Sequence, residues 1–419
     1  MVMLAETKSG SEDALEIIRE ALNISASGIK SSRDLSEKLV SQVIEALSGG
    51  KIPEFESAAL LTALYLKKPS RGERTIFEFF SLNPDDPVAL AEFLLENEPL
   101  QFKDSLIKLL GAGHITADEA YQAGSYLLSG SCGLRAAAAF PIALRMRHEN
   151  RDELVGLYRA MHETLLRVNI KECPTPLIQL AEPFDGTNHS PFITPYLANK
   201  FIEQGFNTIM VSSPSPGPKE AINLNRLLTE LGASFSDINS PTPDQSFGYL
   251  FKLETLSPRL ADWVLLRKRL VKRTFFAAVE KFLSPAKNRI LITSVFHVPY
   301  GEKLVELAEA IALPAIIVSV GGLEGSLTLA GNKNSRLLAG VRTQVGSYKR
   351  FELSVSAAAD KPLEPLKLQG RNILQQNRDI IGSLLSEGGS APLWIEKACA
   401  YSLKAYEEGI NRVMEVIGK

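Results

Sequence analysis

A regular alternation of strand-like and helix-like segments begins near residue 176, and it constrains the fold more than any other feature of the sequence. The apolar run 176–181 predicts a strand, and a polar, glycine-bearing turn follows it at 182–189. A helix that ends near Glu203 and a second strand at 206–212 come next. Strands joined by helices are typical of a mainly parallel sheet with helices on its faces. We therefore expect an α/β domain in this part of the chain.

The turn after the first predicted strand is the main candidate for a ligand site. It contains Asp185-Gly186-Thr187, and the next helix is expected to begin at Thr194, a good N-cap, with Pro195 in its first position. Ligands of parallel sheets bind at the carboxyl ends of strands, where helix N-termini attract anions. The pattern predicts an anion or phosphate site between Asp185 and Thr194, although an ordinary turn has the same composition.

Before about residue 171 the sequence is helical in pattern and contains an internal repeat. The segments 46–50 and 58–64 read Ala-Leu-Ser-Gly-Gly and Ala-Ala-Leu-Leu-Thr-Ala-Leu. Similar segments return about 80 positions later, at 127–130 and 138–144. We interpret this as a duplicated helical hairpin. Its alanine-rich stripes permit close helix packing, so we expect them to serve packing or dimerisation rather than chemistry.

Composition excludes several broad classes of protein. The 419 residues are too many for one compact core, and a hydrophobic fraction of 45% with a net charge of −2 is ordinary for a globular protein. That charge argues against a surface that coats nucleic acid throughout. We find no bilayer-length apolar run and no signal-peptide pattern. Cys132, Cys173 and Cys399 lack metal-ligand spacing. We therefore expect a cytoplasmic protein without a membrane partner.

Four local matches, in order along the chain, resemble the anthranilate phosphoribosyltransferases and their relatives in glycosyltransferase family 3. The helical segment 117–161 resembles that family's helical domain. Residues 267–276, which read Arg-Lys-Arg-Leu-Val-Lys-Arg-Thr-Phe-Phe, resemble its motif Arg-x-x-Leu-Gly-x-Arg-Thr-x-Phe-Asn. Residues 321–325 stand where the family has Asp-Gly-Leu-Asp-Glu, and residues 185–187 where it has Gly-Thr-Gly-Gly-Asp. The resemblance covers roughly residues 115–415.

The resemblance implies a fold class and a division into domains. The expected fold is a helical N-terminal domain followed by a mainly parallel α/β domain of the nucleoside phosphorylase and phosphoribosyltransferase type. Residues 1–114 would form a helical extension with the first hairpin copy, 115–172 the helical domain with the second copy, and 173–419 the α/β domain. We expect a homodimer that forms through the helical domain.

The resemblance also implies a reaction and the residues that serve it. In that family phosphoribosyl pyrophosphate lies on a glycine-rich loop, Mg²⁺ bridges its pyrophosphate to acidic side chains, and an aromatic amine attacks the ribose. In this sequence Glu324 would help to hold Mg²⁺. The implied substrate-binding residues are four members of the turn region and one arginine that would face the acceptor: Asp185, Gly186, Thr187, Thr194 and Arg267.

The sequence departs from the family where a diphosphate and its metal would bind. Asn188 and His189 replace two loop glycines, which hinders close approach of the backbone to a diphosphate. Only Glu324 remains of an acidic pair, because Gly325 occupies the second position, and one carboxylate holds Mg²⁺ more weakly than two. The first hypothesis is therefore a phosphoribosyltransferase-like protein, related to pentosyl-transferring enzymes, that does not act on anthranilate itself.

The second hypothesis is a catalytically inactive family member that binds nucleic acid or nucleotides. The short Asp-Gly turn resembles a divergent branch of the family whose members are similar to nucleic-acid binders. The segment 267–273 carries five cations in seven positions, and Arg269, Lys272 and Arg273 are suited to phosphate backbone contacts. A solvated helix with ion pairs would have the same pattern. A regulatory protein that acts through its helical hairpins is a third hypothesis.

Overall fold

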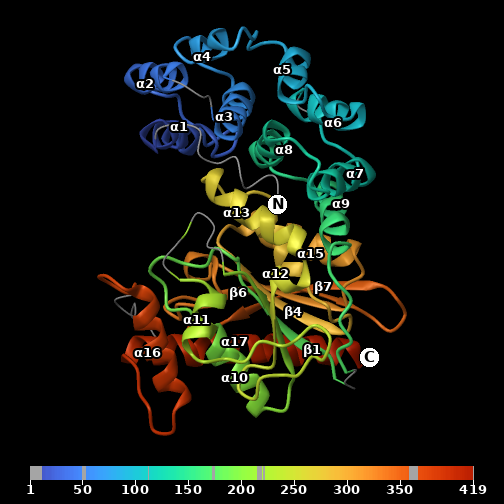
Figure 1. Cartoon of the computed structure of the whole chain (residues 1–419). Helices are drawn as coiled ribbons and strands as arrows, with labels where there is room; N and C mark the ends of the chain where they lie inside the picture. The colour runs from blue at the N-terminus through green and yellow to red at the C-terminus, as the bar shows by residue number, and fades with distance from the viewer. Residues whose placement is uncertain are drawn as a thin grey trace. The chain divides into compact units, whose positions relative to one another are not determined.

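The computed structural model describes residues 12–49, 53–111, 113–171, 175–214, 219, 222–357 and 367–418 (Figure 1). Cys173 lies outside the described residues. The chain forms two compact units, of which the first combines Met1–Thr164 with Arg259–Val279 and the second combines Leu165–Pro258 with Glu280–Lys419. The division places both hairpin copies in one unit, and the segment 259–279 returns to that unit from the later part of the sequence.

The described residues of the first unit form helices and connecting loops. The described residues of the N-terminal part form α1 (Glu12–Ser25), α2 (Glu37–Ser48), α3 (Glu54–Lys67), α4 (Arg74–Phe79), α5 (Pro87–Leu94), α6 (Leu100–Leu110), α7 (Ala117–Leu128), α8 (Leu134–Arg147) and α9 (Arg151–His162). The returning segment contributes α13 (Pro258–Arg269) and α14 (Phe276–Val279). The indole N–H of Trp263 on α13 donates to the carbonyl of Leu127 at 3.1 Å, which ties the returning segment to α7.

The predicted duplication of a helical hairpin is confirmed by equivalent structural details. Ser36 caps α2 and Thr116 caps α7, and each side chain accepts a hydrogen bond from the amide three residues later. The helices α3 and α8 both end at a residue with positive φ, at Lys68 and His148. Both pairs of positions are separated by 80 residues. The two equivalent helices α3 and α8 pack on each other, which helps to explain why most of their residues are buried.

In each hairpin, a buried carboxylate links the start of the first helix to the segment after the second helix. Glu73 and Glu153, again 80 positions apart, are both fully buried. Each accepts hydrogen bonds from an amide just before the first hairpin helix and from an amide three residues upstream of itself. The donors are Leu35 (2.8 Å) and Ser70 (2.7 Å) for Glu73, and Ile115 (3.1 Å) and Asn150 (2.8 Å) for Glu153. The backbone donors of the two carboxylates are therefore equivalent, whereas the side-chain partner is Lys67 for Glu73 and His114 for Glu153.

The second unit is built on a seven-stranded sheet with the strand order β3-β2-β1-β4-β5-β6-β7. Its strands are β1 (Leu177–Ala181), β2 (Thr208–Ser212), β3 (Tyr249–Lys252), β4 (Arg289–Val295), β5 (Ala315–Val320), β6 (Ser335–Arg342) and β7 (Tyr348–Val355). The pairs from β3 to β5 are parallel, whereas β6 and β7 join in antiparallel fashion. The prediction of a mainly parallel α/β domain is confirmed.

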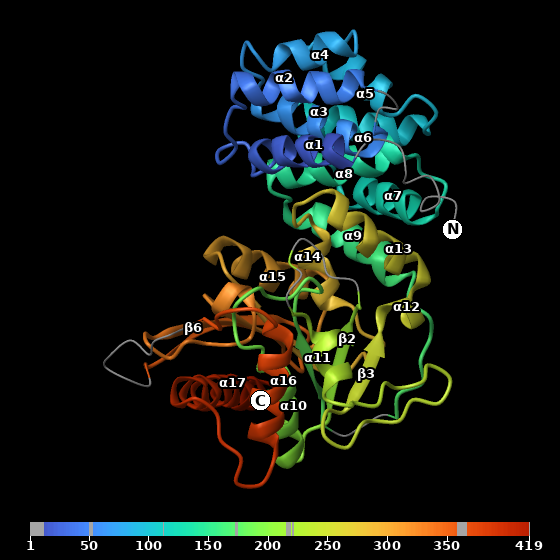
Figure 2. The same cartoon turned by 60° about the vertical axis from the view of Figure 1, so that its left-hand side comes forward.

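Helices cover both faces of this sheet. The unit contains α10 (Thr194–Glu203), α11 (Leu224–Glu230), α12 (Leu253–Leu256), α15 (Val298–Ala310), α16 (Ile373–Leu385) and α17 (Leu393–Ile417), with short 3₁₀ turns at Glu280–Phe282 and Leu323–Gly325. One face packs its apolar side chains against α10, α11, α16 and α17, and α15 lies on the other face (Figure 2). Every residue of β1 and β4 is buried, as expected for central parallel strands.

None of the helices described here is long and apolar enough to cross a lipid bilayer.

Candidate anion-binding site

The loop after β1 folds through close contact with the segment before α11. Gly186 has φ 68°, and its amide donates to the carbonyl of Pro183 at 2.9 Å. Thr187 exchanges two backbone hydrogen bonds with Ile222, at 2.9 and 3.1 Å. A Cβ atom on residue 186 would lie 1.8 Å from the carbonyl oxygen of Ile222. Glycine is therefore required at this position for the approach of two backbone segments within the protein.

The next three residues of the loop form a ring of donors around one carboxylate oxygen. The amides of Asn188, His189 and Ser190 donate to Oε2 of Glu324 at 3.0, 2.9 and 3.0 Å. The Ser190 hydroxyl donates to the same oxygen at 3.0 Å. Successive backbone amides that converge on one point make an anion-binding concavity. In this protein the carboxylate of Glu324 occupies that concavity.

A lysine completes the electrostatic environment of Glu324. The ammonium group of Lys219 lies 3.2 Å from Oε1 and 3.3 Å from the backbone carbonyl oxygen of the same residue. The two side chains are 22% and 24% exposed, so the pair lies at the protein surface. Burial by itself would raise the pKa of Glu324, but the His189 amide, the Lys219 charge and the Ser190 hydroxyl lower this pKa to about 2.

The turn after β5 directs Glu324 toward the loop. Glu324 has φ 52° and Gly325 has φ 83°, so both adopt the left-handed conformation. This conformation favours glycine, which explains why glycine suits position 325. The amide of Leu323 donates to the carbonyl of Thr328 at 2.8 Å, and the Thr328 hydroxyl donates to the carbonyl of Pro191 at 2.6 Å. The turn is thereby fixed to the loop that surrounds the carboxylate.

The predicted role of Thr194 as a helix cap is wrong. The N-cap of α10 is Ile193, and Thr194 is the first helical residue. Its hydroxyl donates to Oε1 of Glu182 at 2.7 Å, and the amide of Leu327 donates to the same oxygen at 2.9 Å. Thr194 and Glu182 are both buried. These hydrogen bonds link the residue after β1 to the start of α10 and to the segment after the Glu324 turn.

The structure brings together most of the residues that the sequence singled out. Asp185 and Thr187 are buried in the loop whose next three amides bind Glu324, and Gly186 lies between them. Arg267 belongs to α13 of the helical unit and is only 1% exposed. Sequence reasoning missed Ser190 and Lys219. The position of Lys219 after β2, the strand beside β1, was the available signal for it.

The arrangement around Glu324 does not suit the predicted Mg²⁺ site. Mg²⁺ requires oxygen ligands with free lone pairs in near-octahedral geometry. Oε2 of Glu324 already accepts four hydrogen bonds, and Oε1 is paired with Lys219. Among the residues that the structure describes, no group of three His, Cys, Asp or Glu side chains could hold a metal ion. The Glu324 carboxylate therefore acts here as an anion that accepts hydrogen bonds.

The cations predicted to contact nucleic acid have partners within the helical unit. The guanidinium of Arg269 donates to both carboxylate oxygens of Glu56 at 2.9 and 2.8 Å, and it lies 4.4 Å from the ring centre of Phe55. Lys272 donates to the hydroxyl of Ser27 at 3.1 Å. Burial, assisted by the nearby charge of Arg145, lowers the pKa of Lys272 to about 8. Nucleic-acid binding by this segment stays a prediction.

Arg273, the third of these cations, is partly buried, and its carbonyl accepts a hydrogen bond from the Arg145 guanidinium.

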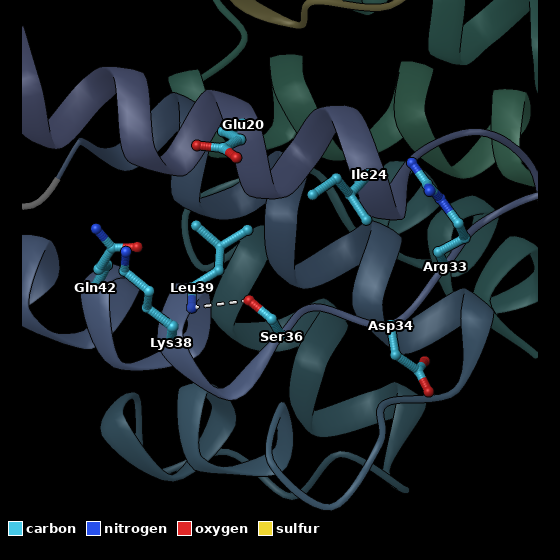
Figure 3. Close-up of a pocket in the computed structure, with 8 residues that line it drawn as sticks. All are labelled: Glu20, Ile24, Arg33, Asp34, Ser36, Lys38, Leu39 and Gln42. Carbon is cyan, nitrogen blue, oxygen red and sulfur yellow. Dashed lines mark hydrogen bonds between the residues drawn. The ribbon is translucent and has the colours of Figure 1, made fainter.

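A second concavity lies on the first hairpin copy (Figure 3). Eight residues from α1, α2 and the loop between them line it: Glu20, Ile24, Arg33, Asp34, Ser36, Lys38, Leu39 and Gln42. Ser36 serves as the N-cap of α2, and its hydroxyl accepts from the amide of Leu39. The lining mixes two acidic and two basic side chains with apolar ones, so it favours no single class of charged ligand.

Comparison with known proteins identifies the relatives of this chain. A family model described as the helical bundle domain of the glycosyl transferase family matches residues 103–165, which include the second hairpin copy. A protein of Aquifex aeolicus, itself described as uncharacterized, is 28% identical over 306 residues, which cover 71% of this chain and 92% of that protein. The anthranilate phosphoribosyltransferase of a Geobacillus species is 25% identical over 225 residues. That alignment covers 52% of this chain and 64% of the relative, slightly less than two thirds of its length.

A solved structure supports the same assignment at the level of the fold. The crystal structure of anthranilate phosphoribosyltransferase from Thermus thermophilus aligns with a TM-score of 0.54 and 21% identity, and covers 75% of this chain and 89% of that one. The chain thus has the fold of a phosphoribosyltransferase with a helical-bundle domain. In sequence and fold it is similar to the anthranilate phosphoribosyltransferases, and its residues 103–165 match the helical bundle domain of the glycosyl transferase family.

Proposed function

We propose that this protein binds a phosphorylated ribose compound in the loop after β1, and that it does not transfer phosphoribosyl groups to anthranilate. The observation that carries the proposal is the convergence of the amides of residues 188–190 and the Ser190 hydroxyl on one oxygen. A phosphate oxygen has the same needs as this carboxylate oxygen, namely several short donors and a nearby positive charge. Lys219 supplies that charge.

The same geometry argues against the reaction of the related enzymes. Departure of a diphosphate from ribose develops negative charge that must be stabilised by preorganised donors or by a metal ion. Glu324 offers no free oxygen to a metal ion in this arrangement, and the glycine at position 325 provides no second carboxylate. The chain's own residues therefore bind and orient a single phosphate group through amides, a hydroxyl and a lysine.

Calorimetric titration of the full chain tests this proposal. We expect ribose 5-phosphate to bind equally well with Mg²⁺ and with a chelator, and unphosphorylated ribose not to bind. Ser190→Ala and Lys219→Met should each weaken binding by about 10- to 150-fold, since a hydrogen bond to a charged group contributes about 1.5–3 kcal/mol. Lys200→Met is the matched control, because Lys200 pairs with Glu203 on the exposed side of α10.

Two results would contradict the proposal. One is binding that requires Mg²⁺ and is indifferent to Ser190→Ala and Lys219→Met. The other is formation of phosphoribosyl anthranilate when the protein is incubated with phosphoribosyl pyrophosphate, anthranilate and Mg²⁺.

No structural observation favours nucleic-acid binding as a second function. Salt-dependent binding of a single-stranded oligonucleotide, lost in the Arg269→Ala, Lys272→Ala, Arg273→Ala triple variant, would support it. Dimerisation through the helical unit also stays a prediction, which sedimentation of the full chain would test.

A further inference from the structure

The anion site of the loop is filled by a group that belongs to the protein itself. All four donors from residues 188–190 point at Oε2 of Glu324, so none of them is left for a second anion. A phosphate oxygen placed on these donors would lie within hydrogen-bond distance of the carboxylate oxygen, and two like charges at that separation repel each other. The carboxylate and an external phosphate group therefore exclude each other from this loop.

We propose that Glu324 is an internal competitor. Its carboxylate occupies the donors of the loop until a phosphate monoester or inorganic phosphate displaces it. This inference rests on the proposed function, because it concerns the same loop. It assigns Glu324 an autoinhibitory role that is different from metal binding.

The surroundings of Glu324 allow the side chain to leave while the backbone stays in place. The side chain is 24% exposed, so it has direct access to solvent. The backbone of its turn is held by hydrogen bonds that do not involve the carboxylate, from Leu323 to Thr328 and from Gly325 to Gly322. Rotation of the side chain breaks its bonds to the loop and to Lys219 and makes the four loop donors available to the ligand beside the Lys219 ammonium group.

The charge balance of the exchange favours a phosphate over a neutral ligand. Departure of the Glu324 carboxylate removes negative charge from the three amides, the Ser190 hydroxyl and the Lys219 ammonium group. A neutral sugar hydroxyl cannot restore the lost charge-assisted bonds, whereas a phosphate dianion brings more negative charge than the carboxylate that it replaces. The loop is thus selective for ligands that carry a full oxyanion.

Removal of the internal carboxylate tests the inference. The full chain, Glu324→Ala and Glu324→Gln are titrated with inorganic phosphate and with ribose 5-phosphate, and Glu203→Ala on α10 is the matched acidic control. If the loop is open in only about one tenth of the molecules, apparent affinity is reduced about tenfold. We therefore expect Glu324→Ala to bind both ligands at least about tenfold more tightly than the full chain and Glu203→Ala.

Glu324→Gln keeps the size of the side chain and removes its charge, so an intermediate gain is expected. If Glu324→Ala does not fold, Glu324→Gln decides the question by the same comparison.

The other outcomes separate this inference from the proposed function. If the full chain and both Glu324 variants bind phosphate with equal affinity, Glu324 does not compete with the ligand, and only the proposed phosphate binding stands. Weaker binding by the variants shows that Glu324 contributes to the ligand site and also overturns the competition. Absence of phosphate binding in every protein, including folded Glu324→Ala, overturns the proposed function together with the inference.

Discussion

Substitution of Gly186 by alanine tests whether this glycine serves the fold of the loop or the approach of a ligand. Alanine at φ 68° costs about 1–2 kcal/mol from the backbone alone. Its Cβ would also lie 1.8 Å from the carbonyl oxygen of Ile222 and 2.7 Å from the Cα of Asn223. These are backbone atoms, so relief of the clash separates Thr187 from Ile222 and breaks two hydrogen bonds of about 1 kcal/mol each. The expected destabilisation is about 3–4 kcal/mol.

Gly205→Ala provides the matched control for this prediction. Gly205 has φ 87°, and a Cβ atom added to it would have no neighbouring atom within 4 Å. It therefore carries the backbone cost of about 1–2 kcal/mol without the clash. In thermal unfolding followed by circular dichroism, 1 kcal/mol corresponds to roughly 2–4 °C for a domain of this size, so Gly186→Ala should unfold roughly 4–8 °C below Gly205→Ala.

The comparison also has a functional readout. Gly186→Ala should weaken phosphate binding, because the displaced loop no longer aims its amides at one point, and Gly205→Ala should not. Equal unfolding temperatures for the two variants would refute the reasoning, since they would show that the approach of Ile222 does not require glycine at position 186.

Three further predictions concern charged groups. The folded-state pKa of Glu324 is about 2, below the ordinary 4.5, so its stabilisation is complete above pH 4.5 and is lost as the pH falls through 2. The stability difference between the full chain and Glu324→Gln in urea should therefore shrink between about pH 5 and pH 3, and a constant difference would contradict this. Arg269→Lys should lower the free energy of unfolding by about 1–3 kcal/mol, because lysine cannot make the two-point contact with Glu56; unchanged thermal stability would argue against that contact. Glu73→Gln should lower the unfolding temperature more than Glu153→Gln, because only Glu73 forms a buried ion pair, with Lys67, whereas Glu153 contacts the more exposed His114; equal unfolding temperatures would contradict this.

The fold was predictable from the sequence because it depends on side-chain patterns. Apolar runs such as 177–181 and 315–320 became strands, since central parallel strands are buried on both faces. The hairpin repeat was visible because alanines recur in α3 and α8, the two helices that pack on each other. The N-cap of α10 was misplaced by one residue, because the Thr194 hydroxyl found a partner in buried Glu182 rather than in the helix backbone.

The site was only partly predictable, because its donors are backbone amides. Every residue except proline carries an amide, so the amides of Asn188 and His189 leave no signature in the residue types at those positions. Their acceptor, Glu324, is more than 130 residues away in the sequence, and Lys219 is 105 residues away from it. The cation-rich segment was ambiguous for the same reason, since Glu56, the partner of Arg269, is separated from it by 213 residues.

The identity of a residue at a motif position does not by itself determine its role. A carboxylate at position 324 would suit a metal site if negative oxygens surrounded it. Here the Lys219 ammonium group lies 3.2 Å away and three amides point at the other oxygen, so the local potential is positive. A positive potential stabilises the carboxylate and repels a dication, and it attracts any phosphate that can displace the carboxylate. In the competition proposed above, the charges around Glu324 therefore make it a competitor of the ligand rather than a metal ligand.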